Sequence, residues 1–174
     1  MNKLPNHTAL KEWSSVVAAL GRGEQIVLVR KGGIADPSFG VEAERFYLYP
    51  TYFHQGESEA RPSATITHWC EVVRTWTIEN AAQLERLAPL VVLPQETLTA
   101  RFRFRPDQAL YVIGIRTWAL AAPAAIAYRE EYGGCRSWIS IEDEIGIDGS
   151  QPVLDERELA IQLERVRALL RAAA

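Results

Sequence analysis

The chain has 174 residues, of which 48% are hydrophobic and 24% are charged, and its formal net charge at pH 7 is −3. These fractions are close to those of average globular proteins, so they exclude a disordered or low-complexity chain. The length predicts one domain over residues 1–174, with a core at about 8–145 and a closing helix at about 154–172. The negative net charge excludes a protein that is basic over its whole surface, but it leaves local basic patches open.

The sequence contains no signal for export or for a membrane span. No apolar run approaches the ~20 residues that cross a bilayer, and the opening MNKLPNH lacks the apolar region of a secretory signal. The two cysteines, Cys70 and Cys135, are too few for a disulfide framework. We therefore expect a cytoplasmic protein without membrane attachment, and the oligomeric state stays open.

Hydrophobic spacing predicts a helix and then three strands in the first half of the chain. Thr8 is a favourable N-cap for a helix whose apolar residues recur at Leu10, Trp13, Val17 and Leu20. Runs of β-forming residues without a helical period predict strands at 25–30, 45–49 and 65–78. The segment 54–63 has the composition of a loop.

The second half alternates between strand and helix signals. Asn80 is expected to cap a short helix, and the strict alternation of Arg and Phe over 101–105 predicts a half-buried strand. Strands are also expected at 110–118 and 137–141, while 119–127 is ambiguous because a proline interrupts an alanine-rich run. Asp155 and Glu158 have the spacing of a capping box at the start of a closing helix. The elements together predict an α+β fold: a mostly antiparallel sheet or partial β-barrel with an N-terminal and a C-terminal helix.

Two segments carry cations in a pattern suited to phosphate. Arg30-Lys31-Gly32-Gly33 places two cations before a glycine turn whose N–H groups can converge on an anion. If 101–105 is a strand, its arginines share one face, about 6.8 Å apart, close to the repeat of consecutive phosphates; they are Arg101, Arg103 and Arg105. A plain β-turn and a charged edge strand account for the same residues without any ligand.

A third segment, Tyr52-Phe53-His54-Gln55, combines aromatic side chains with a titratable imidazole and an amide. Tyr52 and Phe53 could stack on nucleic-acid bases, and His54 could act as a general base. Core packing by the aromatics, with the polar pair capping a turn, is the alternative interpretation.

The usual metal and nuclease motifs are absent from the sequence. Cys70, Cys135 and His68 lack the paired spacing of a zinc site, and none of the three lysines has an acidic residue two positions before it, as a restriction-type E-x-K core needs. The acidic run 142–144 is interpreted as a solvated strand end. We expect no metal and no cofactor.

Several phrases together resemble DUF1802, a bacterial family of unknown function. The phrases are Lys11-Glu12-Trp13, Val29-Arg30-Lys31-Gly32-Gly33-Ile34, Phe46-Tyr47-Leu48-Tyr49-Pro50-Thr51 with His54-Gln55, and Tyr132-Gly133-Gly134-Cys135-Arg136-Ser137-Trp138. The resemblance implies no specific activity, although occasional links to restriction-endonuclease domains suggest nucleic-acid defence or processing. The order helix, glycine turn, strand over 19–30 also resembles small PUA-like or ASCH-like barrels, which implies a nucleic-acid site near the basic end of that strand.

Two functions follow from these residues. The first is a module that binds RNA or single-stranded DNA, or another anionic ligand, with phosphates held by the cations named above and bases on the aromatics. The alternative is a small hydrolase or phosphoesterase in which His54 is the base and Glu12 or Glu44 orients it. We also expect Arg30, the pair His54-Gln55 and Arg136 to line one anion-binding cleft. We expect Arg30 to have little burial, so that Arg30→Ala leaves folding intact.

Overall fold

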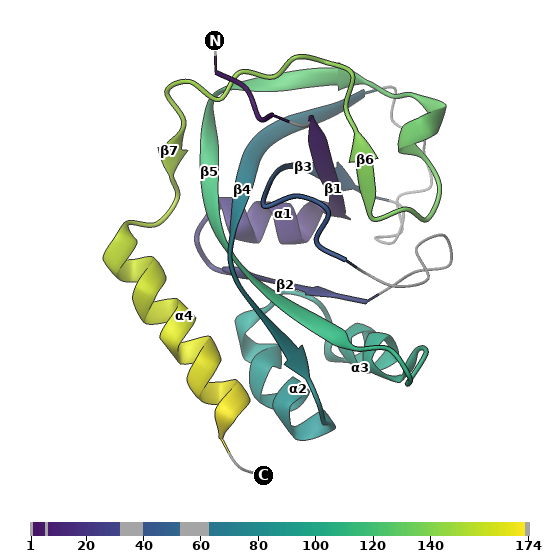
Figure 1. Cartoon of the computed structure of the whole chain (residues 1–174), viewed down its shortest axis with the longest axis vertical. Coiled ribbons are helices and arrows are strands. Elements are labelled where there is room, and N and C mark those ends of the chain that lie inside the picture. The colour runs from purple at the N-terminus through teal and green to yellow at the C-terminus, as the bar shows by residue number, and fades with distance from the viewer. Residues whose placement is uncertain (1, 6, 32–39, 53–62, 173–174) are drawn as a thin grey trace.

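A computed structural model of the chain describes residues 2–5, 7–31, 40–52 and 63–172. The described residues contain a seven-stranded, strongly curved sheet in the order β2-β5-β4-β3-β1-β6, with β7 paired to β5 (Figure 1). All pairings are antiparallel except the one between β1 and β3. The strands are β1 (Thr8–Trp13), β2 (Val27–Arg30), β3 (Arg45–Thr51), β4 (Ser63–Ile78), β5 (Leu110–Ala127), β6 (Trp138–Ser140) and β7 (Gln151–Pro152).

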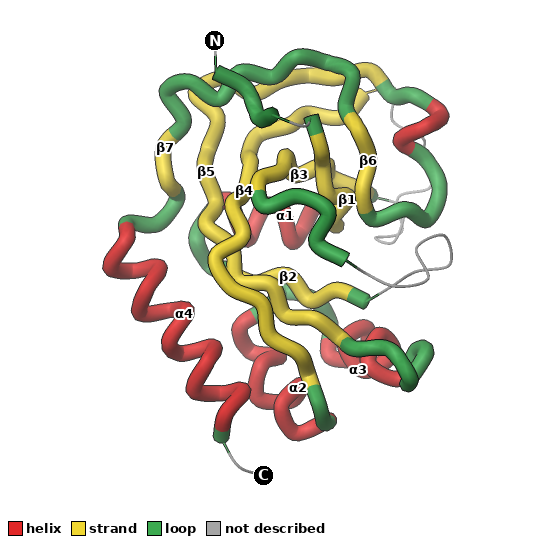
Figure 2. Tube along the Cα trace, in the orientation of Figure 1, coloured by secondary structure: helices red, strands yellow, loops and turns green. Residues whose placement is uncertain are grey.

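The described helices surround the curved sheet rather than forming a separate layer of their own (Figure 2). They are α1 (Ser14–Gly21), α2 (Ala81–Leu87), α3 (Gln95–Arg103) and α4 (Glu156–Arg171), with 3₁₀ turns η1 (Ala88–Leu90) and η2 (Glu130–Tyr132). Within the described residues, none of these helices has the length and apolar character that crossing a membrane requires. The fold is therefore α+β with a mostly antiparallel sheet, as the sequence predicts.

Side chains from both faces of the sheet are buried, because strand residues alternate between the two faces. Phe46, Leu48 and Cys70 belong to one core cluster, which α1 and α4 help to cover. Tyr47 and Trp69 belong to a second cluster on the opposite face. The Tyr47 hydroxyl closes that second cluster by accepting from Leu4 N and donating to the carbonyl of residue 145.

The long hairpin of β4 and β5 forms the spine of the sheet. Their register runs from Ile78 opposite Leu110 to Ser63 opposite Ala127, with irregularities near His68 and Arg74. The ambiguous alanine-rich segment is therefore strand. Its proline lies between residues 119 and 124, where the two strands slip in register, so the missing N–H breaks no regular ladder.

The predicted N-terminal helix begins five residues later than expected. Residues Thr8–Trp13 form β1, which lies between β3 and β6, and the helix begins only at Ser14. The apolar residues at positions 10, 13, 17 and 20 do fit a helical period, but backbone partners on both sides and burial of both Ala9 and Leu10 favour the strand. Tertiary pairing outweighs local spacing here.

The predicted strand at 101–105 is wrong. Residues Gln95–Arg103 form α3, whose Leu98 is fully buried and whose Phe102, four residues later, packs against the same core. This i, i+4 pair and the good helix formers before it outweigh a five-residue alternation. The chain then reverses at Arg105, which has a positive φ of 44°.

Two predicted helix starts are confirmed. The Asn80 side chain accepts a hydrogen bond from Gln83 N at the start of α2. At α4, Asp155 accepts from Glu158 N, and the Glu158 carboxylate accepts from Asp155 N, so the capping box is complete.

Candidate anion-binding site

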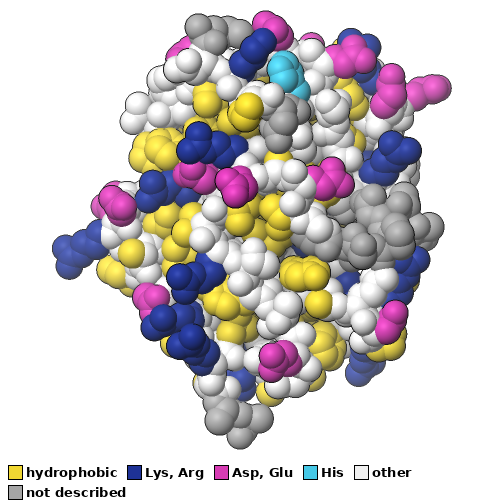
Figure 3. Space-filling view, viewed as in Figure 1, with side chains coloured by type: hydrophobic (Ala, Val, Ile, Leu, Met, Phe, Trp, Pro, Cys, Tyr) yellow, Lys and Arg dark blue, Asp and Glu magenta, His cyan; other side chains and the backbone are white. Residues whose placement is uncertain are grey.

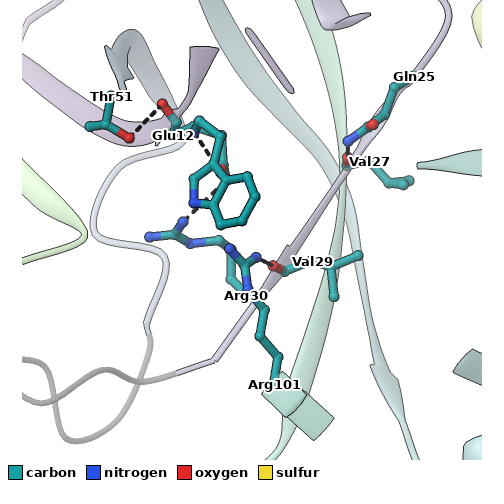
Figure 4. Close-up of polar contacts among 8 residues, drawn as sticks. Glu12, Gln25, Val27, Val29, Arg30, Thr51 and Arg101 are labelled. Carbon is teal, nitrogen blue, oxygen red and sulfur yellow. Dashed lines mark hydrogen bonds and ion pairs between the residues drawn. The ribbon is translucent and has the colours of Figure 1, made fainter. Parts of the chain in front are cut away.

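Arg30, the last residue of β2, pairs with a buried carboxylate of β1. Its Nη1 lies 3.1 Å from Glu12 Oε2, and the two side chains are 11% and 1% exposed. The other carboxylate oxygen accepts from Trp13 N at 2.9 Å, and the Glu12 carbonyl accepts from the Thr51 hydroxyl at 3.1 Å (Figure 4). The expectation that Arg30 is a strand-end cation with little burial is therefore wrong.

A second guanidinium reaches the same place from α3. Arg101 Nη1 donates to the Val29 carbonyl at 2.7 Å, and its guanidinium carbon lies 5.8 Å from the centre of the Trp13 ring. Figure 4 shows Arg30 and Arg101 approaching each other from different elements. Burial lowers the pKa of Arg101; Glu12 opposes the shift and the charge of Arg30 adds to it.

One further cation of the predicted set, Lys31, adjoins this pair, and Arg103 lies nearby in the chain. The half-buried Lys31 donates to the Phe102 carbonyl at 2.9 Å and lies 6.0 Å from the Phe102 ring centre. Burial lowers the pKa of Lys31, and Asp107 partly offsets that shift. Arg103, the next residue after Phe102, is exposed and makes no ion pair within the described part of the chain. We call Glu12, Arg30, Lys31 and Arg101 the basic corner; Arg103, two positions along α3 from Arg101, faces a different side of that helix.

The three arginines expected to share one strand face do not do so. Arg101 is half-buried against Trp13, Arg103 is exposed, and Arg105 sits at the chain reversal with its guanidinium 5.1 Å from the Phe104 ring centre. The predicted regular phosphate spacing is lost because the segment is helical. Of the three, Arg101 reaches the basic corner.

The aromatic segment after β3 is only partly described. Tyr52 is half-buried and directly follows Thr51, whose hydroxyl is bonded to Glu12. Gly32, Gly33, Phe53, His54 and Gln55 lie outside the described residues, so their predicted roles stay predictions. The hydrolase hypothesis also stays a prediction, because it depends on His54. Of its two orienting carboxylates, Glu12 is committed to Arg30 and Glu44 is exposed.

The glycine turn before β6 is held by Lys11. Its ammonium donates to the carbonyls of Gly133 and Gly134 at 3.2 and 2.7 Å, and Arg136 beyond the turn is exposed. Because Lys11 and Glu12 are consecutive strand residues, their side chains leave β1 on opposite faces. The single cleft containing Arg30 and Arg136 stays a prediction, and the proposals below use only the side of Glu12.

The residues considered for a metal have other roles. Cys70 is buried beside the Thr117 hydroxyl, which lies 3.7 Å from its sulfur, whereas Cys135 is exposed. His68 Nδ1 lies 2.7 Å from the Thr67 hydroxyl. Over the described ranges, no three His, Cys, Asp or Glu side chains are placed to hold a metal ion. Of the acidic run, Glu142 pairs with Arg129 and Glu144 with Lys3.

On the face seen in Figure 3, the charges are mostly intermixed. Figure 3 shows acidic and basic side chains side by side over much of one face, with a row of basic side chains along α4. That helix carries its own acidic residues, and Arg167 pairs with Glu164. At the basic corner, two guanidiniums lie near one buried carboxylate, which is ion-paired with Arg30.

The family model described as a domain of unknown function, DUF1802, matches residues 9–165, which is most of the chain. The chain belongs to the DUF1802 family. No protein among curated sequences matches it. The phrases by which this DUF1802 chain resembles its family meet in the structure, since Lys11-Glu12-Trp13 contacts both the Arg30 end of β2 and the Gly133 turn.

Solved structures of an ASCH protein from Zymomonas mobilis share the fold of this DUF1802 protein. A crystal structure of one point mutant has a TM-score of 0.53 at 12% identity and covers 94% of this chain and 99% of its own. The structure of the ASCH protein titled without a mutation has a TM-score of 0.51 at 12% identity, covering 90% and 93%. At such identities the likeness shows the fold alone, which confirms the ASCH-like resemblance of the sequence.

Two residues around the site have roles that the sequence patterns do not predict. Trp13, which fits a helix face in the sequence, lies beside the Arg101 guanidinium, and Lys11 holds the glycine turn on the other face of β1. Both belong to the phrase Lys11-Glu12-Trp13, which is the signal that could have found them.

Proposed function

We propose that this protein binds RNA or single-stranded DNA, and that the basic corner contacts the phosphates. The observation that carries the proposal is the charge balance at this corner. Two guanidiniums, those of Arg30 and Arg101, lie near one buried carboxylate, Glu12, which is ion-paired with Arg30. Lys31 adds a further cation, which Asp107 partly balances. A protein with a net charge of −3 thus concentrates positive charge at one place, which favours an anionic ligand there.

The chemistry of the corner suits a nucleic acid better than a simple counter-ion. Arginine presents a planar fork of donors that matches phosphate oxygens, and it is favoured over lysine for that reason. Tyr52 follows the strand that is bonded to Glu12, so an aromatic ring lies close by in the chain. Alternating cations and aromatic rings are typical of single-strand binding surfaces.

The fold gives weaker support of the same kind. Small ASCH-like and PUA-like barrels, by the resemblance described above, imply a nucleic-acid site near the basic end of the strand that follows the first helix and glycine turn. Arg30 and Lys31 occupy that end here. Fold alone does not determine function, and a role in restriction-linked defence or RNA processing stays a prediction.

Titration with short single-stranded RNA and DNA tests the proposal. If the corner contacts roughly three phosphates, affinity should fall about 20-fold between about 50 and 200 mM salt. Binding that is absent at the lower salt concentration, or that does not depend on salt, would overturn the proposal.

Lys31→Ala provides the site-specific arm of this experiment. Lys31 belongs to the corner, whereas Arg157 is exposed, lacks an ion pair in the described ranges and lies on α4, away from the corner. Lys31→Ala should reduce the salt slope by about 0.7, the contribution of one phosphate contact to a single strand. Arg157→Ala should leave the slope unchanged, and equal effects of the two substitutions would contradict the assignment of the corner.

A further inference from the structure

The side chains of the basic corner are largely buried, and this restricts which phosphates can reach their donors. Only 11% of the Arg30 side chain is exposed, and the Glu12 side chain beside it is 1% exposed. Arg101 and Lys31 are half-buried. The phosphates of a duplex lie on a rigid convex surface, whereas the end of a single strand is narrow and flexible. A chain end can therefore reach such donors where a duplex cannot.

The donors that remain at the corner are arranged for one anion. Arg101 is fixed by its bond to the Val29 carbonyl and by the ring of Trp13, so little side-chain freedom is left to lose on binding. A guanidinium has five N–H donors, and the described contacts of Arg101 use one of them. Its planar fork can bind two oxygens of the same phosphate.

We infer that the basic corner binds the terminal phosphate monoester of a single-stranded nucleic acid, with Arg101 as its principal ligand. The inference rests on the proposed function and narrows it to one chemical group. A monoester has three free oxygens and a charge near −2 at neutral pH, against −1 for each internal diester. Arg30 and Lys31 flank this phosphate.

Calorimetric titration of one octanucleotide sequence tests this assignment. The oligonucleotide is compared in three forms, with a 5′-phosphate, with a 3′-phosphate and with neither, as RNA and as DNA. We expect one or both phosphorylated forms to bind about tenfold more tightly than the form with no terminal phosphate. The preferred end identifies the polarity of the bound strand. The preference should shrink from pH 7 to pH 5, because the monoester loses charge near pH 6.

Arg101→Lys assigns the preference to a residue. The substitution keeps a positive charge but removes the planar fork, so most of the tenfold preference should be lost. Arg157→Lys on α4 is the matched control and should keep it. If Arg101→Lys does not fold, as judged by thermal melting, the comparison of the three oligonucleotide forms on the unmodified protein still decides the question.

The possible failures are distinguishable. Equal affinity for phosphorylated and unphosphorylated ends, with salt-dependent binding, overturns the terminal-phosphate assignment and leaves the proposed function intact. A preference that survives Arg101→Lys assigns the phosphate to another residue and overturns the role of Arg101. If no form of the oligonucleotide binds, both the inference and the proposed function fall.

Discussion

Glu12 is a charged residue with 2% of its surface exposed, and such burial is costly unless the charge is paired. Here both carboxylate oxygens have partners, Arg30 on one side and the Trp13 N–H on the other. Removing one member of the Glu12–Arg30 ion pair leaves the other member buried without that counter-charge, and this strongly lowers the stability of a protein. The Glu12–Arg30 pair therefore stabilises the fold and also belongs to the proposed phosphate-binding site.

Glu12→Gln should lower the free energy of unfolding by about 3 kcal/mol, because it removes the charge of a buried ion pair with Arg30. Urea denaturation followed by circular dichroism measures the change. Glu164→Gln is the control: its partner Arg167 lies 2.8 Å away, but the Glu164 side chain is 60% exposed. That surface pair should contribute less than about 0.5 kcal/mol, and similar losses for the two variants would contradict this account.

Cys70 makes stability depend on pH above neutrality. Burial raises the pKa of the Cys70 thiol from 9.0 to about 12, an effect that a hydrogen bond with Thr117 partly offsets. The unfolded chain releases this proton near pH 9 while the folded protein keeps it. The stabilisation is therefore complete below pH 9 and is lost between pH 9 and about 12.

Between pH 8.5 and 10, the native protein should lose about 1 kcal/mol more stability than Cys70→Ala, which cannot titrate at this position. Urea denaturation of both proteins at the two pH values gives the difference, in which other titrating groups cancel. An equal loss in both proteins would show that Cys70 does not titrate differently on unfolding.

At the scale of elements, the capping residues and the apolar spacing in the sequence of α4 determine where this helix begins and which face is buried. Its first turn is closed by the reciprocal bonds of Asp155 and Glu158, and it packs Leu159, Val166 and Leu170 on the sheet. The apolar residues recur on one face, so burial and capping favour the same limits for the helix.

Asp155→Ala should reduce the free energy of unfolding by about 1 kcal/mol, since the Glu158 N–H loses its acceptor. Asp155→Asn, which keeps a side-chain oxygen at the cap, should recover most of that loss. Thermal or urea unfolding of the three proteins measures it. A loss as large in Asp155→Asn as in Asp155→Ala would mean that charge rather than capping is responsible.

At the scale of the whole molecule, the Glu12–Arg30 pair joins parts of the sheet that are not neighbours. β2 is at one end of the strand order and β1 is next to the other end, so strong curvature must bring them together. Thr51 and Arg101 add contacts from β3 and α3 at the same place. Side-chain contacts thus connect β1 and β2, two strands that are not paired through their backbones.

Arg30→Ala should destabilise the protein by about 3 kcal/mol or more, because Glu12 then stays buried without a cation. The double variant Glu12→Gln with Arg30→Ala should lose less stability than the sum of the two single variants, as it removes both charges. Urea unfolding of the set gives the coupling between the two residues. Additive losses would contradict a direct pair.

Local signals in the sequence were enough to predict several helices and strands. β2, β3, β4 and the first part of β5 follow from runs of β-forming residues, and α2 and α4 from capping residues followed by apolar spacing. The α+β class and the family follow as well, because the quoted phrases cover most of the matched range. These features depend on residues close together in the chain, where propensity and capping act.

Only the tertiary structure decided β1, α3 and the composition of the basic corner. Residues 8–13 fit a helical period but pair with β3 and β6, and the Arg-Phe alternation belongs to a helix end because Leu98 and Phe102 pack together. The pairing of Glu12 with Arg30 and the position of Arg101 beside Trp13 join residues 18 and 88 positions apart. Such contacts form only because the sheet curves strongly. That curvature is stabilised by packing across the whole molecule and not by any local segment.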